Sequence, residues 1–251
     1  MDRLIYTAFN TVNNIYDNRS VRAQNLANVN VPGYRSDLGA KSVGTAFLDN
    51  MTSLQTRALA IRDDNNFFEA DPGTLSQTDY DLDVAIRGDG YFMVKGQNEL
   101  SLTRRGDLKV NTDGILENGA SQAMLNADLQ PITVPGYRSI KVADNGDVII
   151  EPLNSPLGTK QIIGRIALTF AADKELKKFP DGEIRTADGT LPDIDADVSL
   201  VPQHMELSNV NITDELINSI EDQRQYEINI KLISSASEID EAGASLIRMP
   251  S

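Results

Sequence analysis

The chain contains no cysteine and no tryptophan, and it has a single histidine among its 251 residues. Without cysteine it has no disulfide framework, no thiolate nucleophile and no cysteine-based zinc site. The single histidine, His204, has no serine or cysteine nucleophile context around it, so it is a poor candidate for acid–base catalysis. We therefore expect no catalytic residue and no enzymatic activity.

Basic residues are fewer than acidic ones. The chain has 23 lysines and arginines against 37 aspartates and glutamates, which gives a formal net charge of −14. A nucleic-acid partner is disfavoured, because phosphate binding needs lysine and arginine, and an anionic membrane surface is disfavoured for the same reason. No stretch approaches the ~18 apolar residues of a spanning helix, so we expect no membrane insertion. The opening residues, MDRLIYTAFNTVNN, lack the continuous apolar segment of a cleavable signal peptide.

Patterns that bind metals or cofactors are incomplete. Asp79, Asp81 and Asp83 alternate as calcium ligands do, but the glycine and the distant glutamate of an EF-hand loop are missing. The solvent face of a strand explains this alternation better. Gly88-x-Gly90 lacks the third glycine and the following helix of a dinucleotide site, which favours a hairpin turn. We expect no metal, no cofactor and no small-molecule substrate.

The N-terminal region has the periodicity of an amphipathic helix from Leu4 to Val29. Asn28–Asn30 is a plausible stop, and the residue before Pro32 is pushed into an extended conformation. Gly33 then permits a turn. The helical stripe contains Ile5, Ala8, Val12, Ile15, Leu26 and Val29, with Arg19 and Arg22 as basic interruptions.

The C-terminal region predicts a second, longer helix. Thr213 is a candidate N-cap, with Asp214 and Glu215 in the first turn, and the pattern runs to about Arg248 without proline. Two apolar stripes are more than a single partner helix covers, so the helix is either buried in its own domain or packed on further chains. One stripe holds Ile217, Ile220, Arg224, Ile228, Leu232, Ile239, Ala242 and Leu246; the second holds Leu216, Ile230, Ile233, Ala244 and Ile247.

Between the ends the hydrophobic period changes to two. Short β-prone runs alternate with Asp-Gly and Asn-Gly turns, a pattern typical of an antiparallel β-domain. We therefore predict an α+β protein in which an antiparallel β-domain is inserted into a discontinuous, coiled-coil-like helical domain. The expected divisions are an N-terminal helix at 1–36, an extended and partly β connector at 37–79, the β-domain at 80–205 and the C-terminal helix at 206–251.

Three separated motifs then give a family resemblance. QNLANVNVPGYR, LDVAIRGDGYFMV with LTRRGDLKVNTDGIL, and LSNVNITDELINSIEDQRQYEINIK are similar, in this order, to motifs of the flagellar rod and hook family. Val31 replaces the usual threonine, and Leu102 and Leu108 replace aromatic residues. The turn motif is carried by Asn25, Leu26, Ala27, Asn28, Pro32, Gly33 and Tyr34, and the C-terminal motif by Ser208, Asn209, Val210, Gln223, Arg224, Tyr226, Glu227 and Asn229.

The resemblance implies an axial structural protein of the bacterial flagellum, polymerised helically in the basal-body rod that transmits torque across the periplasm. The start MDRLIYTA and the length resemble the proximal rather than the distal rod members. Implied partners are the protein itself, other rod subunits and the flagellar type III export apparatus, which reads no cleaved signal. The alternatives are a distal rod or hook subunit, or a secreted β-rich binding module.

The resemblance also implies that the terminal helices form an inner layer and that the β-domain lies outside it. Arg19, Arg22 and Arg224 then either snorkel at a helix edge or pair across chains and fix the register. The candidate interface residues are Ile5, Val12, Ile15, Arg19, Arg22, Leu26, Ile217, Ile220, Arg224, Ile228, Leu232 and Ile239.

Overall fold

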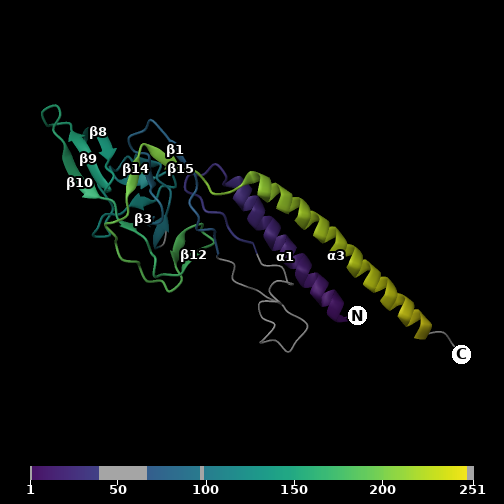
Figure 1. Cartoon of the computed structure of the whole chain (residues 1–251). Helices are drawn as coiled ribbons and strands as arrows, with labels where there is room; N and C mark the ends of the chain where they lie inside the picture. Colours follow the sequence, from purple (N-terminus) through teal and green to yellow (C-terminus); the bar gives the residue numbers. More distant parts are fainter. Residues whose placement is uncertain (1, 40–66, 97–98, 248–251) are drawn as a thin grey trace. The chain divides into compact units, whose positions relative to one another are not determined.

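The computed structural model describes residues 2–39, 67–96 and 99–247 (Figure 1). The chain divides into two compact units. Within the described residues, a helical unit comprises 2–27, 37–39 and 211–247, and a β unit comprises 28–36, 67–96 and 99–210. Each unit is therefore assembled from segments that are far apart in the sequence.

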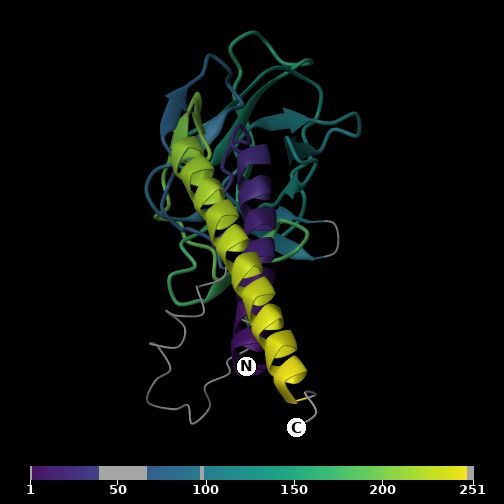
Figure 2. The ribbon, with the colours of Figure 1, turned by 90° about the vertical axis from the view of Figure 1, so that its right-hand side faces the viewer.

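The helical unit pairs two long helices, α1 (Asp2–Ala27) and α3 (Ile212–Ile247), which run side by side (Figures 1 and 2). The pair is antiparallel, because the last turns of α1 meet the first turns of α3. Arg22 Nε lies 2.6 Å from Asp222 Oδ2, and Arg22 Nη1 lies 3.3 Å from Glu215 Oε2. α3 is ten residues longer than α1, which corresponds to ~15 Å of additional helix.

The N-cap of α3 differs from our prediction. Asn211, not Thr213, caps the helix: its Oδ1 accepts a hydrogen bond from Thr213 N at 3.0 Å, and its carbonyl accepts one from Glu215 N at 3.0 Å. Asparagine is at least as good a cap as threonine, and Asn211 directly precedes the first helical residue. The acidic side chains of Asp214 and Glu215 lie in the first turn, where the helix dipole favours them.

The β unit contains fifteen short strands and no described helix. They are β1 (Leu75–Gln77), β2 (Val84–Ile86), β3 (Tyr91–Lys95), β4 (Leu100–Thr103), β5 (Leu108–Val110), β6 (Leu116–Asn118), β7 (Ala123–Met124), β8 (Tyr137–Val142), β9 (Asp147–Pro152), β10 (Gln161–Arg165), β11 (Leu168–Thr169), β12 (Leu176–Lys178), β13 (Ile184–Thr186), β14 (Leu200–Pro202) and β15 (His204–Glu206).

The strands form four antiparallel sheets. The largest has the order β12-β13-β4-β3-β7-β6-β5, with β11 also paired to β3. A three-stranded sheet has the order β10-β9-β8, and the pairs β14-β2 and β1-β15 form two small sheets. In the last of these, Leu75 is opposite Glu206, so the segment that enters the β unit and the segment that leaves it are paired there.

Strand β3 is at the centre of the packing. Phe92 and Val94 point into one hydrophobic cluster, and Tyr91 and Met93 point into another on the opposite face. Successive residues of a strand face opposite sides of the sheet. All four side chains are nevertheless buried, so both faces of β3 are covered. A central strand covered on both faces explains why the segment YFMV is apolar without alternation.

The α+β class and the antiparallel strands agree with the sequence prediction, but the junctions lie elsewhere. Residues 28–36 and 206–210, which we assigned to the helical domain, belong to the β unit. Their backbones are hydrogen-bonded into it, as in the bond from Gly33 N to Glu206 O (2.8 Å). Of the predicted connector, residues 40–66 lie outside the described residues, and 67–79 belong to the β unit and contain β1.

Candidate functional site

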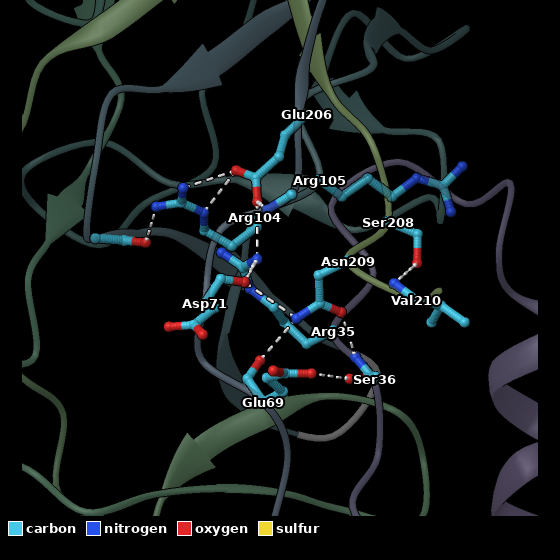
Figure 3. Close-up of polar contacts among 12 residues, drawn as sticks. Arg35, Ser36, Glu69, Asp71, Arg104, Arg105, Glu206, Ser208, Asn209 and Val210 are labelled. Carbon is cyan, nitrogen blue, oxygen red and sulfur yellow. Dashed lines mark hydrogen bonds and ion pairs between the residues drawn. The ribbon is translucent and has the colours of Figure 1, made fainter. Parts of the chain in front are cut away.

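A buried ionic cluster lies where the chain enters and leaves the β unit. We call it the Glu206 cluster; its members are Arg35, Arg104 and Glu206 (Figure 3). Asn209 lies beside it and bonds the same Asp71 carbonyl as Arg35. Glu206 ends β15, and its side chain has no exposed surface. Its Oε1 lies 2.9 Å from Arg35 Nη1 and accepts a hydrogen bond from Gly73 N at 3.0 Å. Its Oε2 lies 2.8 Å from Arg104 Nε and 2.7 Å from Arg104 Nη2.

The cluster holds two guanidinium groups against one carboxylate. The side chains of Arg35 and Arg104 are only 2% and 1% exposed. Backbone carbonyls accept their other hydrogen bonds: Arg35 Nη1 donates to Asp71 O, and Arg104 Nη1 donates to Gly90 O at 2.7 Å. Burial lowers the pKa of Arg35, and Glu206 opposes that shift. The single carboxylate therefore compensates two buried cations, and each depends on it.

Gly33 brings the turn motif onto this cluster. Its φ of +63° is in the left-handed region, as the turn prediction required, and its N–H donates to Glu206 O at 2.8 Å. A Cβ at Gly33 would lie 2.4 Å from Arg104 C and 2.5 Å from Arg104 O. Both the conformation and the close backbone approach exclude a larger residue. Upstream, Val31 N donates to Asn28 O at 3.0 Å and closes the turn that follows α1.

Asn209 of the C-terminal motif connects three segments. Its Oδ1 accepts a hydrogen bond from Ser36 N at 2.7 Å, and its Nδ2 donates to Glu69 O at 3.1 Å and to Asp71 O at 3.0 Å. Ser36 Oγ donates to Glu69 Oε2 at 3.0 Å. One amide side chain thus bonds residues near position 36 to residues near position 70.

Neighbouring residues of both motifs complete the junction. Ser208 Oγ accepts a hydrogen bond from Val210 N at 3.2 Å, and Val210 is buried. Lys178 Nζ lies 3.8 Å from the centre of the Tyr34 ring and donates to Arg35 O at 2.9 Å. This buried lysine thus holds the motif loop through a cation–π contact and a hydrogen bond.

A second polar site lies within the helical unit, around Asn25. This side chain is 1% exposed and donates from Nδ2 to Glu215 Oε1 at 2.7 Å and to Asp37 O at 2.9 Å. Its Oδ1 accepts a hydrogen bond from Asp37 N at 2.8 Å. With the Arg22 ion pairs to Glu215 and Asp222, it joins the end of α1 to the start of α3. Asn25 is therefore the turn-motif residue that acts inside the helical unit.

The side of α3 that bonds α1 is neither of the two apolar stripes seen in the sequence. The less exposed positions recur at steps of three and four residues and are mostly polar or small. They are Glu215, Asn218, Ser219, Asp222, Tyr226, Asn229, Ile233, Ala236 and Gly243. Apart from Ile233, the described side chains of both apolar stripes lie outside this set. Period alone did not reveal the α1-facing side, because that side is not apolar.

The candidate interface residues divide accordingly. On α1, Ile15 is buried, Val12, Arg22 and Leu26 are half-buried, and Arg19 is exposed; the Ile5 side chain lies outside the described residues. On α3 the candidates are exposed: Ile217 51%, Ile220 69%, Ile228 55%, Leu232 39% and Ile239 55%, together with Arg224. The single chain therefore leaves the predicted stripe of α3 uncovered.

The second half of the C-terminal motif lies on α3. Gln223 Nε2 donates to Glu227 Oε1 at 3.1 Å along the exposed side of the helix. Asn229 Nδ2 donates to Gln225 O at 2.8 Å, and Tyr226 and Asn229 are half-buried on the α1-facing side. The motif is thus divided between the β unit and the helical unit.

The roles of Arg35, Arg104 and Glu206 were not predicted from the sequence. A signal was present: all three charged residues are in or beside the family motifs, and Glu206 follows a strand pattern in HMEL. The alternation in HMEL, however, places Glu206 with His204 on the polar side, opposite Met205 and Leu207, so it predicts an exposed carboxylate rather than one with a buried cationic partner. No local sequence pattern indicates which of the arginines pairs with Glu206.

Other chemical signals lead to no reactive site in the part of the chain that the structure describes. It contains no group of three or more His, Asp or Glu side chains arranged to hold a metal ion. His204 Nδ1 lies 2.9 Å from Pro202 O. Asp81 receives a hydrogen bond from Gln203 and an ion pair from Lys141, which together lower its pKa. Within the same residues no helix has the length and apolarity needed to cross a membrane.

Comparisons with known proteins agree with the motifs. The model described as "Flagellar basal body rod FlgEFG protein C-terminal" matches residues 201–246, and that described as "Flagellar hook protein FlgE/F/G D1 domain" matches residues 85–150. The flagellar basal-body rod protein FlgF of Escherichia coli is 30% identical over 97% of this chain and 96% of its own length. The chain belongs to the flagellar basal-body rod protein family.

Two further family members extend the similarity. FlgF of Salmonella typhimurium is 29% identical over 99% of this chain and its full length, and the basal-body rod protein FlgG of Bacillus subtilis is 26% identical over 95% and 97%. The first family match contains Glu206 and Asn209, and the second contains Arg104. Gly33 and Arg35 lie outside both matches, so the structure adds the turn motif to the site.

Proposed function

We propose that this protein is a structural subunit of the bacterial flagellar basal-body rod, which polymerises helically with itself and other axial proteins and transmits torque. The observation that carries the proposal is the uncovered apolar surface of α3. Five side chains of its predicted stripe are 39–69% exposed on a 36-residue helix. Full burial of such a side chain is worth ~1.5–3 kcal/mol, so neighbouring helices would gain much by covering them.

The arrangement of the helices supports a coiled-coil-like inner layer. From Ser219 to Ala236 the α1-facing positions of α3 recur at alternating three- and four-residue steps, which is the spacing of a coiled-coil seam. Polar members such as Asp222, paired with Arg22, would fix the register of α1 against α3. The exposed side chains of the two apolar stripes would then serve contacts between chains.

The Glu206 cluster supports a mechanical role for the junction. The segments that enter and leave the β unit are paired in β1 and β15 and share the carboxylate of Glu206. Torsional force that reaches either segment would be distributed over both, because neither can move without breaking the buried ion pairs. Such a junction suits a subunit whose inserted domain is loaded through the segments that enter and leave it.

The finer assignments rest on the sequence. We infer a place in the proximal rod from the resemblance of the segment MDRLIYTA to the proximal members of the family. A periplasmic rod position and export through the flagellar type III apparatus are what the family resemblance implies, and the absence of cysteine fits both. The role requires no catalysis, and FlgF and FlgG relatives across nearly the whole chain favour it over a secreted binding module.

The test is complementation of a strain from which the gene has been deleted. We expect basal bodies whose rod is truncated at its base, and recovery of swimming with the wild-type gene. Ile228→Asp and Leu26→Asp should abolish recovery, because assembly would bury an unpaired carboxylate at a cost of several kcal/mol. Tyr80→Asp, at a site of the β unit that is 74% exposed, is the matched control and should swim. Complete rods in the deletion strain would refute the proposal.

A further inference from the structure

A cavity beside the Glu206 cluster has no role in the proposed rod function. Its volume is about 280 Å³, close to the lower end of the ~300–1,000 Å³ that is typical of small-ligand sites. Its walls are formed mainly by Arg35, Gly90, Tyr91, Arg104, Phe170 and Leu176, and we name it the Arg35 cavity. All these residues belong to the β unit, so the cavity does not depend on the helical unit.

Arg35 keeps one edge of its guanidinium group unpaired. Nη1 lies 2.9 Å from Glu206 Oε1 and also donates to the carbonyl of Asp71 (Figure 3). Nε is buried without a hydrogen-bond partner among the described residues, and Nη2 donates to none of them either. Nε and Nη2 together form an edge that binds a carboxylate through two parallel hydrogen bonds. Because a buried donor without an acceptor is costly, this edge indicates an anionic ligand.

The buried charges beside the cavity do not balance. Arg35 and Arg104 carry two positive charges, and Glu206 supplies one negative charge. Tyr91 lines the same cavity and is 7% exposed. Burial raises the pKa of Tyr91, and the charges of Arg35 and Arg104 oppose that rise, so the phenol lies within the electrostatic field of both. A neutral hydroxyl donor beside one excess positive charge suits a ligand with a single negative charge.

Two aspartates near the cavity are exposed to solvent. Asp89 lines the cavity, and Asp71 contributes its backbone carbonyl to Arg35. Their carboxylates lower the positive potential, but water and salt screen exposed charges far more than buried ones. The excess positive charge of the buried groups therefore persists inside the cavity, while Asp89 opposes the entry of an anion.

We propose that the Arg35 cavity binds a carboxylate carried on a short apolar stem. The oxygens pair with Arg35 and Tyr91, and the stem lies against the half-buried side chains of Phe170 and Leu176. One negative charge matches the excess of one positive charge, whereas phosphate carries more charge and has no apolar part. The same chemistry is present in a free short-chain carboxylic acid and in the glutamate side chain of a polypeptide.

Butyrate and butyramide, which have nearly the same shape, test the proposal on the purified full chain. Nuclear magnetic resonance of the nitrogen-labelled chain would follow the assigned Nε–H signal of Arg35. We expect butyrate to shift this signal saturably and to raise the melting temperature, because a ligand that binds the folded state stabilises it. Butyramide should bind at least about tenfold more weakly, since it lacks the charge. Equal affinities for the two compounds would overturn the proposal, as would phosphate that binds as tightly as butyrate.

Two variants connect the binding to this cavity. Tyr91→Phe keeps the ring and removes the hydroxyl, so it should weaken butyrate binding by about tenfold. Asp89→Asn removes a negative charge that opposes entry, so it should tighten binding by about threefold. Tyr80→Phe, at a site of the β unit that is 74% exposed, is the matched control and should leave the affinity unchanged. An unaltered affinity in Tyr91→Phe would place the binding elsewhere and contradict the proposal.

A blocked tripeptide distinguishes the two sources of the carboxylate. If acetyl-Ala-Glu-Ala-amide displaces butyrate and its glutamine counterpart does not, the cavity accepts a glutamate side chain of a polypeptide. If neither peptide displaces butyrate, the ligand is a free acid. Displacement by both peptides, or an Arg35 signal that no carboxylate shifts, would refute the proposal. Each measurement uses the single chain, so its result is separate from that of the rod-assembly test.

Discussion

Replacement of Glu206 by glutamine tests the buried cluster with almost no change of shape. The carboxylate compensates both Arg35 and Arg104 and also accepts the Gly73 N–H. A neutral amide would turn one oxygen acceptor into an NH2 donor that faces either Arg104 or the pair formed by Arg35 and Gly73. It would also leave two buried cations without a counter-ion. Breaking a buried ion pair in this way costs ~3–5 kcal/mol.

The expected effect is large enough for thermal unfolding. For a unit of this size each kcal/mol lowers the melting temperature by ~2–4 °C, so Glu206→Gln should lower the transition of the β unit by about 10 °C. Circular dichroism of the full chain measures the transition. The control is Glu151→Gln, because Glu151 pairs with the half-exposed Arg138 at 3.6 Å and such surface pairs are worth less than ~1 kcal/mol. Equal shifts for the two variants would refute the assignment of Glu206 as the shared counter-ion.

Three further predictions follow from the same structure. Gly33→Ala should destabilise the β unit by more than ~3 kcal/mol, through its left-handed φ and the contact with the Arg104 backbone, while Pro32→Ala should cost less than ~1 kcal/mol in denaturant titrations. Asn25→Ala should lower amide-exchange protection at the end of α1 by ~2 kcal/mol, and Asn13→Ala, at an exposed site on the same helix, should not. Burial raises the pKa of Tyr91 above its usual 10.0, so its contribution to stability is present below pH 10 and is lost at higher pH; Tyr91→Phe should lose less stability there.

The terminal helices and the class of the central domain could be read from the sequence because both depend on local periodicity. α1 and α3 follow from helical spacing and from the stop before Pro32, and the strands follow from period-two runs between Asp-Gly and Asn-Gly turns. The left-handed Gly33 was also predictable, since a turn after proline at a helix end favours glycine. These features need no knowledge of distant residues.

The ion pairs could not be read in the same way. Glu206 meets Arg104, which is 102 residues away in sequence, and Arg22 meets Asp222, which is 200 residues away. Nothing local distinguishes these arginines from Arg19 or Arg105. The α1-facing side of α3 was missed for a related reason: its buried positions include Asp222, which burial tolerates only because Arg22 neutralises it. Apolar periodicity identifies surfaces that are still uncovered in the single chain.

We infer different roles for the polar pairs and the exposed apolar side chains: the former in folding of one chain, the latter in assembly. Polar pairs, namely Arg22–Asp222 in the helical unit and Arg35–Glu206–Arg104 in the β unit, fix the registers inside one chain. A buried ion pair adds little net stability over a well-packed apolar core, but it penalises any register that separates the charges. Under the proposed rod function, the exposed apolar side chains of α3 would serve contacts between chains, because burial of apolar surface is favourable and non-directional. If apolar contacts also set the registers inside one chain, the apolar side chains of α3 would already be buried there. They would then offer no exposed surface to a neighbouring subunit.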